Sequence, residues 1–130
     1  MKAIDQQIFD AFYVLSDSLG YDTFVTLPNS KAKYPFVVLG DVQISPIHTM
    51  SGMLGKVYLS VDVWGTQKER LEVSTICQTL FVKANYLQLD KLSAVLDANA
   101  SSIRMLRDDS TQSTLWHGLL SLEFNLRREK

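Results

Sequence analysis

The chain has 130 residues, and its 13 basic and 14 acidic side chains leave a formal net charge of -1. This near-balance excludes a global attraction to nucleic acid or to an anionic membrane. A hydrophobic content of 46% at this length predicts one folded domain over residues 1–130. Cys77 is the only cysteine, which excludes an internal disulfide and a cysteine-based zinc site and favours a reducing compartment.

The first residues do not have the pattern of a targeting segment. Asp5 and Asp10 fall where a signal peptide would need its apolar core, and no run approaches the ~18–20 apolar residues of a membrane span. We therefore expect no membrane association and folding in a cytoplasm.

The first predicted element is an amphipathic helix from Ala3 to Leu19. Its apolar residues recur at spacings of three and four. They are Ile4, Ile8, Ala11, Phe12, Leu15 and Leu19. Gly20 follows, where a left-handed residue would end the helix. A short extended piece, Thr23 to Leu27, and a turn over residues 28–30 complete this part.

Two long strands are predicted next, "FVVLGDVQI" (residues 36–44) and "KVYLSVDVWG" (residues 56–65). Alternation with period two divides each strand into two faces. In the first strand the expected core face is Phe36, Val38, Gly40, Val42 and Ile44, and the other face is Val37, Leu39, Asp41 and Gln43. In the second strand the expected core face is Val57, Leu59, Val61 and Val63, with Trp64 on the opposite face.

A second helix is predicted after Thr66, which forms a capping-box pattern with Glu69. Its apolar stripe is Val73, Ile76, Cys77, Leu80, Phe81 and Ala84. Free cysteine on such a stripe is typical of a small buried hydrophobe. Residues 87–100 leave two alternatives open, because some of their leucines alternate as in a strand while others fit one helical turn.

The last part of the sequence predicts two strands, "SIRMLRD" (residues 102–108) and "LWHGLLSLEFNLR" (residues 115–127), joined by a polar turn. The expected core face of the final strand is Trp116, Gly118, Leu120, Leu122, Phe124 and Leu126. The order of elements predicts an α+β domain: an antiparallel or mixed β-sheet with two main α-helices packed on one face.

No residue pattern indicates catalysis, a cofactor or a metal. His48 and His117 have no ligand partners at metal-binding spacing, and the pair Asp108 and Asp109 fits a solvated turn better than a carboxylate dyad. "SGMLGK" (residues 51–56) lacks the spacing of a phosphate loop. The basic residues of "NLRREK" (residues 125–130) have no interleaved aromatics, so we expect no nucleic-acid site and no enzymatic activity.

The stretch "SPIHTMSGMLG" (residues 45–55) is longer than a hairpin turn needs and carries several apolar residues. Long, methionine-containing loops suit adaptable contact surfaces. The candidate protein-interaction residues are Ile47, His48, Met50, Met53 and Leu54. The alternatives are that His48 is simply solvated and that both strands extend and shorten the loop. Val37, Leu39 and Leu119 add apolar surface to the second faces, which predicts a partner on that side.

The sequence resembles a known family in three places. These are "YPFVVLGDVQ" (residues 34–43), "VYLSVDVWG" (residues 57–65) leading directly into a charged helix, and the strictly alternating last strand. Together they resemble the small tail-completion proteins of long-tailed bacteriophages and prophages, called tail terminators or tail-to-head joining proteins. The resemblance covers nearly the whole chain.

The resemblance implies a structural role without catalysis. Proteins of this kind form a ring, typically a hexamer, on the head-proximal end of the tail tube, where they end tube polymerisation and join the tail to the head. The implied partners are further copies of the chain, the tail tube protein and head-tail connector proteins, and DNA passes through the ring without specific binding. The implied location is the virion, with assembly in the cytoplasm of a bacterial host. Alternatives are another head-tail connector component or a small ligand-binding α+β domain.

Overall fold

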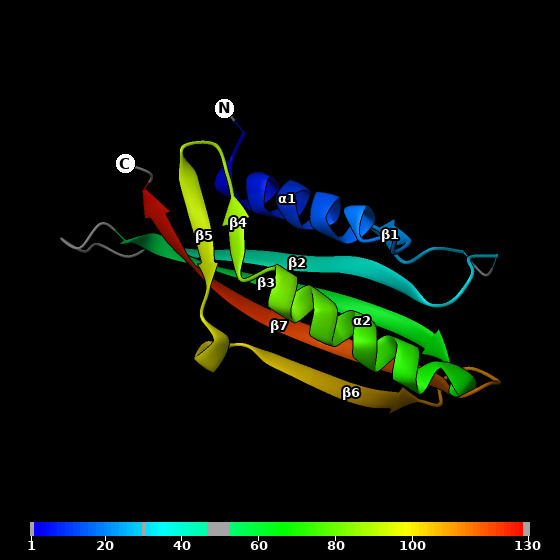
Figure 1. Ribbon diagram of the computed structural model, residues 1–130. Coiled ribbons are helices and arrows are strands. Elements are labelled where there is room, and N and C mark those ends of the chain that lie inside the picture. Colours follow the sequence, from blue (N-terminus) through cyan, green and yellow to red (C-terminus); the bar gives the residue numbers. More distant parts are fainter. Residues whose placement is uncertain (1, 30, 47–52, 129–130) are drawn as a thin grey trace.

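The computed structural model describes residues 2–29, 31–46 and 53–128. Within them lie two α-helices and seven strands (Figure 1). The elements are α1 (Ile4–Ser18), β1 (Thr23–Phe24), β2 (Phe36–Pro46), β3 (Met53–Thr66), α2 (Arg70–Lys83), β4 (Tyr86–Gln88), β5 (Leu92–Leu96), β6 (Ser102–Asp108) and β7 (Leu115–Arg128). The α+β class predicted from the order of elements is confirmed.

The strands form one sheet with the order β1-β2-β3-β7-β5-β4, and β6 also pairs with β7. The pair β1–β2 is parallel and all other pairs are antiparallel, so the sheet is mixed. One edge of β7 pairs with β3 along almost its whole length. Its other edge is divided between two strands: β6 pairs with residues 115–121 and β5 with residues 124–128 (Figure 1).

Helix α1 ends as its sequence predicts. Gly20 has φ +89°, in the left-handed region, and its N–H donates to the carbonyl of Asp17 at 3.0 Å. The N–H of Tyr21 donates to the carbonyl of Ser16 at 3.3 Å, which completes a Schellman motif. The extended piece that follows is shorter than expected, because only Thr23–Phe24 pairs as a strand.

Helix α2 begins with a turn of 3-10 helix over Gln67–Glu69 before the regular helix starts at Arg70. The backbone N–H of Thr66 donates to Oε1 of Glu69 at 2.8 Å. This bond is one half of the predicted capping box and satisfies a donor that the helix leaves unpaired. Residues 87–100, which the sequence left open, contain β4, β5 and a 3-10 turn at Ala98–Ala100.

One hydrophobic core joins both helices to the long strands. The predicted alternation of β3 is confirmed, because Val57, Leu59, Val61 and Val63 are all within 1% of full burial. The alternation of β7 is also confirmed, with Leu120, Leu122, Phe124 and Leu126 in the same cluster. The helices contribute Ile8, Phe12, Val73, Ile76, Cys77 and Leu80 to this cluster.

The expected faces of β2 are wrong for its first half, and a β-bulge is the reason. Leu39 pairs with Val61 and Val42 pairs with Leu59. Three residue steps along β2 therefore lie opposite two residue steps along β3, which places one extra residue in β2. The extra residue reverses the alternation. Val37 and Leu39 therefore belong to the core cluster, and the expected partner surface at these two residues does not exist. Phe36 and Val38 lie on the opposite face instead.

Glycine is required at the bulge because β3 passes close by. A Cβ on Gly40 would meet the side chain of Ser60 and lie 2.9 Å from its carbonyl oxygen. The Ser60 hydroxyl also accepts the N–H of Asp41 at 3.0 Å, so the bulge leaves this donor satisfied.

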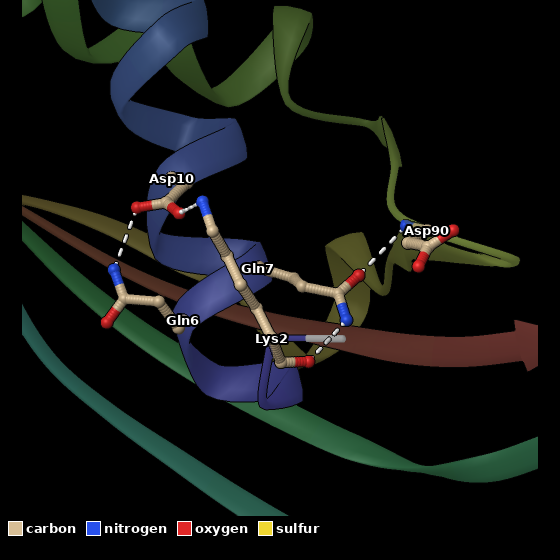
Figure 2. A network of polar contacts seen from close by, with 5 residues as sticks. All are labelled: Lys2, Gln6, Gln7, Asp10 and Asp90. Carbon is tan, nitrogen blue, oxygen red and sulfur yellow. Dashed lines mark hydrogen bonds and ion pairs between the residues drawn. The ribbon is translucent and has the colours of Figure 1, made fainter.

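The start of α1 is tied to the turn between β4 and β5 by Gln7, which is 8% exposed. Its Nε2 donates to the carbonyl of Lys2 at 2.8 Å, and its Oε1 accepts the N–H of Asp90 at 2.8 Å (Figure 2). The neighbouring Gln6 and the Lys2 ammonium both bond the Asp10 carboxylate at the surface. These two bonds lower the pKa of Asp10, the Lys2 bond contributing most.

Replacing Gln7 by Leu should lower the free energy of unfolding by about 1–3 kcal/mol, because the N–H of Asp90 loses its buried acceptor. The matched control is Gln6→Leu, which removes a bond to Asp10 at the exposed surface and should cost less than about 0.5 kcal/mol. Urea denaturation measures both. Equal costs for the two variants would contradict the bridging role of Gln7.

Strand β7 and helix α2 approach each other at Gly118. A Cβ there would run into Sγ of Cys77 and lie 3.0 Å from Cγ1 of Val73. The missing side chain thus lets the helix lie close to the strand.

Gly118→Ala should therefore destabilise the protein by about 1–3 kcal/mol through overpacking. Combined with Cys77→Ala, which removes the obstructing sulfur, the cost of the added methyl group should fall. A double-mutant cycle measured by denaturation tests this coupling. Strict additivity of the two substitutions would show that Cys77 is not the obstacle.

Candidate functional site

The sheet has a second face, formed by the residues that alternate with the core residues of the long strands. We call it the open face. Its members are Phe36, Val38 and Gln43 of β2, Tyr58, Ser60, Asp62 and Trp64 of β3, Arg104 and Leu106 of β6, and Leu115, His117, Leu119, Ser121 and Glu123 of β7. Leu119, which the sequence placed here, is half-buried on this face.

Three residues from β3 and β7 form a fixed cluster on the open face. Trp64 and His117 are direct cross-strand neighbours, and their rings stack with centroids 4.1 Å apart and planes 3° from parallel. Nε2 of His117 lies 2.5 Å from Oδ1 of Asp62, which precedes Trp64 by two residues on the same face. Each ring is thus held by a partner, and the cluster forms a flat and rigid surface.

Aromatic rings continue from this cluster across β2. Phe36 pairs with Trp64 in the strand register, stacks on Tyr34 at 4.9 Å and meets the edge of Phe24 at 5.6 Å. Phe36 is 4% exposed, whereas Tyr34 is 37% exposed. An aromatic band defined by Phe24, Tyr34, Phe36, Trp64 and His117 therefore crosses four strands. Aromatic surfaces of this kind are enriched in protein interfaces.

A buried carboxylate lies further along the open face. Glu123 is 3% exposed, and its Oε2 is 3.6 Å from Nζ of Lys56. The hydroxyl of Tyr58, its neighbour in the strand register, hydrogen-bonds to Glu123, and this bond is the main cause that raises the pKa of Tyr58. The backbone of Glu123 bonds Ser101 Oγ and the N–H of Asp97. Glu123 thus has the partners that a buried charge requires, which favours a structural role.

The other ionisable residues singled out in the sequence are also used structurally. Oδ1 of Asp108 accepts the N–H of Ser110 at 2.8 Å, and hydrogen bonds from Ser110 lower the pKa of Asp108. Asp109 accepts the hydroxyl of Thr114 and is 3.5 Å from Arg107. Both carboxylates therefore belong to a turn, as the sequence indicates. Burial raises the pKa of the Cys77 thiol to about 12, so this sulfur stays protonated.

The described part of the chain has several surface hollows, two of which lie next to a helix. One, of about 500 Å³, lies between α1 and β4 and includes Val14, Leu15 and Tyr86. The other, of about 590 Å³, lies between Tyr34, the start of α2 and the turn before β7. Its lining is mostly threonine, glutamine and serine, with Lys68 as the charged residue. Neither lining brings an acid, a base and a nucleophile together in the way that catalysis needs.

The predicted interaction loop is shorter than expected, because the strand-extension alternative is correct. β2 continues to Pro46, β3 begins at Met53, and Pro46 pairs with Gly55. Of the five candidate residues, Ile47, His48 and Met50 lie outside the described residues. Met53 and Leu54 are the first two residues of β3. Whether these residues bind a partner stays a prediction.

Sequence reasoning missed the cluster of Asp62, Trp64 and His117. The period-two pattern placed Asp62 and Trp64 on one face of a strand and His117 on the polar face of another. It could not bring them together, because the register of β3 against β7 joins residues 55 positions apart.

Within residues 2–29, 31–46 and 53–128, the structure contains no helix that is long and apolar enough to cross a membrane. Over the same residues there is no group of three or more His, Cys, Asp or Glu side chains that could hold a metal ion.

The chain is similar to known proteins in both sequence and structure. The family model described as tail completion protein gp17 matches residues 14–125. Among solved structures, a chain from the virion of a native gene transfer agent particle superposes with a TM-score of 0.61 at 12% identity. The match covers 96% of this chain and 95% of the other, so the two share a fold. Comparison with curated protein sequences gives no match.

The bond between Tyr58 and Glu123 predicts a specific pH dependence. Because the raised pKa belongs to the folded protein, the bond's contribution to stability is present below the usual tyrosine pKa and is lost as the pH rises through the raised value. Among the five tyrosines, one should therefore ionise late when phenolate absorbance is followed against pH.

Glu123→Gln should shift this late transition toward the usual pKa, and Tyr58→Phe should remove it. A late transition that survives Tyr58→Phe would assign it to another tyrosine.

Proposed function

The chain belongs to the tail completion protein gp17 family, and on that premise we propose that it forms a ring on the head-proximal end of a phage tail tube. There it ends tube polymerisation and joins the tail to the head. The observation that carries the proposal is the family match over residues 14–125, which indicates a structural role in a phage tail. The fold shared with a chain of a virion particle agrees with this role.

The proposed assembly is a hexamer of this chain, bound to the tail tube protein on one side and to head-tail connector proteins on the other. It would be part of the virion, after assembly in the cytoplasm of a bacterial host. DNA passes through the ring without specific binding, and the net charge of -1 supports this because it provides no strongly basic lumen. The role needs binding surfaces and no chemical step.

Residues 1–130 act as one domain in this proposal, with both helices packed on the same face of the sheet. Phe12 of α1 and Cys77 of α2 belong to one core cluster with Val61 and Leu120, which supports this arrangement. In Figure 1 α2 lies in front of β3 and β7. The open face, with its aromatic band, then remains available for contacts between proteins.

The end of the β2–β3 hairpin supplies a second contact in the proposal. Here Ile47, His48, Met50, Met53 and Leu54 would contact the tail tube or a neighbouring subunit. Support comes from the length of the paired strands, since β2 and β3 continue to Pro46 and Met53. Met and Leu side chains at such a position offer an adaptable apolar contact.

Removing the gene from the phage or prophage that encodes it should give tails that are too long or variable in length and that carry no head. Electron microscopy of lysates measures tail length and head attachment, and complementation with the intact gene is the control. Tails of normal length without heads would instead indicate a connector component. Normal, infectious particles would contradict both roles.

Replacing residues 47–52 by Asn-Gly should leave the fold intact but abolish termination, because the proposed contact loses three of its five residues while a four-residue turn still joins Pro46 to Gly55. Circular dichroism checks the fold, and complementation checks tail length. Gln112→Ala, an exposed substitution in the turn before β7, is the matched control and should complement fully. Full complementation by the shortened hairpin would remove this loop from the contact surface.

A further inference from the structure

The sheet has two long edges that no strand covers. β6, over its seven residues Ser102–Asp108, pairs only with β7 among the described residues. On the other side of the sheet, β1 covers the outer edge of β2 only at Val37 and Val38, so along residues 40–46 the edge that faces away from β3 has no strand partner in the described chain. Alternate N–H and C=O groups of such edges point outward and can pair with another chain.

The directions of these two edges match each other. β3 runs antiparallel to β2, β7 antiparallel to β3, and β6 antiparallel to β7. Three reversals make β6 antiparallel to β2 within one copy. If a second copy is placed beside the first in the same orientation, its β2 edge therefore meets the first copy's β6 edge as an antiparallel pair. The open faces of the two copies then form one continuous surface.

The lengths of the two edges also match, although their positions along the sheet differ. The centre of β6, Met105, is level with Val37 through the pairs with Gly118 and Val63. The centre of the uncovered part of β2 is Gln43, and placing Arg104 opposite Gln43 keeps both on the open face, with Asp41 as the diagonal neighbour of Arg104. The second copy must therefore shift along the strands by about five residues, or ~17 Å. Over the four strands of one repeat, spaced ~4.8 Å apart, this stagger corresponds to a strand tilt of about 40°, which lies in the range of closed sheets.

Opposite charges lie on the two edges. Arg104 of β6 is exposed and lies on the open face, because it pairs with Leu119. Asp41 of β2 is exposed and lines a depression on the open face together with Tyr58 and Ser60. Neither side chain has an ion-pair partner among the described residues. An antiparallel pair between copies would bring the two charges to the same face of one sheet.

We propose that copies of this chain join by edge pairing, with β6 of one copy antiparallel to residues 40–46 of the next and Arg104 close to Asp41. The two edges are different surfaces, so the contact is head-to-tail and can close into a ring. This inference rests on the ring proposed above, for which it names the joining surfaces.

Two single variants test the pairing, Asp41→Cys and Arg104→Cys, each treated with a short bis-maleimide. A covalent dimer should form when the two variants are mixed and not when either is treated alone. Wild-type protein should not react, because Cys77 is fully buried and its pKa is raised to about 12. The matched control is Lys83→Cys, an exposed site at the end of α2, which should give no dimer with Asp41→Cys.

Charge exchange provides a second measurement. Arg104→Glu should raise the concentration needed for self-association at least about tenfold, and Asp41→Lys in the same chain should restore it. Light scattering behind size-exclusion chromatography measures the association, and thermal unfolding checks the fold of each variant.

Each outcome bears on the proposal. A dimer from either cysteine variant alone would indicate symmetric edge pairing and overturn it. Assembly seen by light scattering without a dimer in the mixture would assign the contact to another surface. A chain that stays monomeric at all concentrations would overturn self-pairing of the free protein, while the tail-length experiment still decides the proposed function. Dimers in the mixture with normal tails in the gene deletion would keep the pairing and reject tail termination.

Discussion

The antiparallel pairing of β3 with β7 is the constraint on which the rest of the structure depends. The two 14-residue strands pair from Thr66 and Leu115 at one end to Met53 and Arg127 at the other. Every second residue from Val57 to Val63 and from Leu120 to Leu126 is in the core, so a slip of one residue would expose these residues to solvent. β2 is added to the free edge of β3, and β5 and β6 share the free edge of β7.

The bulge in β2 determines which residues of this strand lie on the surface that we propose for contacts. Because one extra residue is inserted before Val42, the first half of β2 turns Val37 and Leu39 into the core and Phe36 to the open face. Phe36 then lies beside Trp64, and the aromatic band becomes continuous. Without the bulge, Phe36 would compete for space in a core that is already filled. A local irregularity thus separates packing residues from surface residues on one strand.

Polar groups in the described chain mainly serve structure. Gln7 joins two distant segments, Glu123 is held by Lys56 and Tyr58, and His117 is held by Asp62 and Trp64. This use of polar residues agrees with a protein whose work is binding, as expected for a tail completion family. The open face with its aromatic band and the two uncovered strand edges are the features of the described residues that are suited to contacts between chains.

The sequence by itself determined the features that depend on local periodicity and capping. Alternation placed Val57 to Val63 and Leu120 to Leu126 in the core, three-four spacing identified both helices, and Gly20 and Glu69 marked helix ends. The quoted segments also led to the correct family. Only the tertiary structure decided the bulge at Gly40, the cluster of His117 with Asp62, and the strands of residues 86–96. Each of these depends on which residues of another strand lie opposite, and that register comes from packing between segments far apart in the sequence.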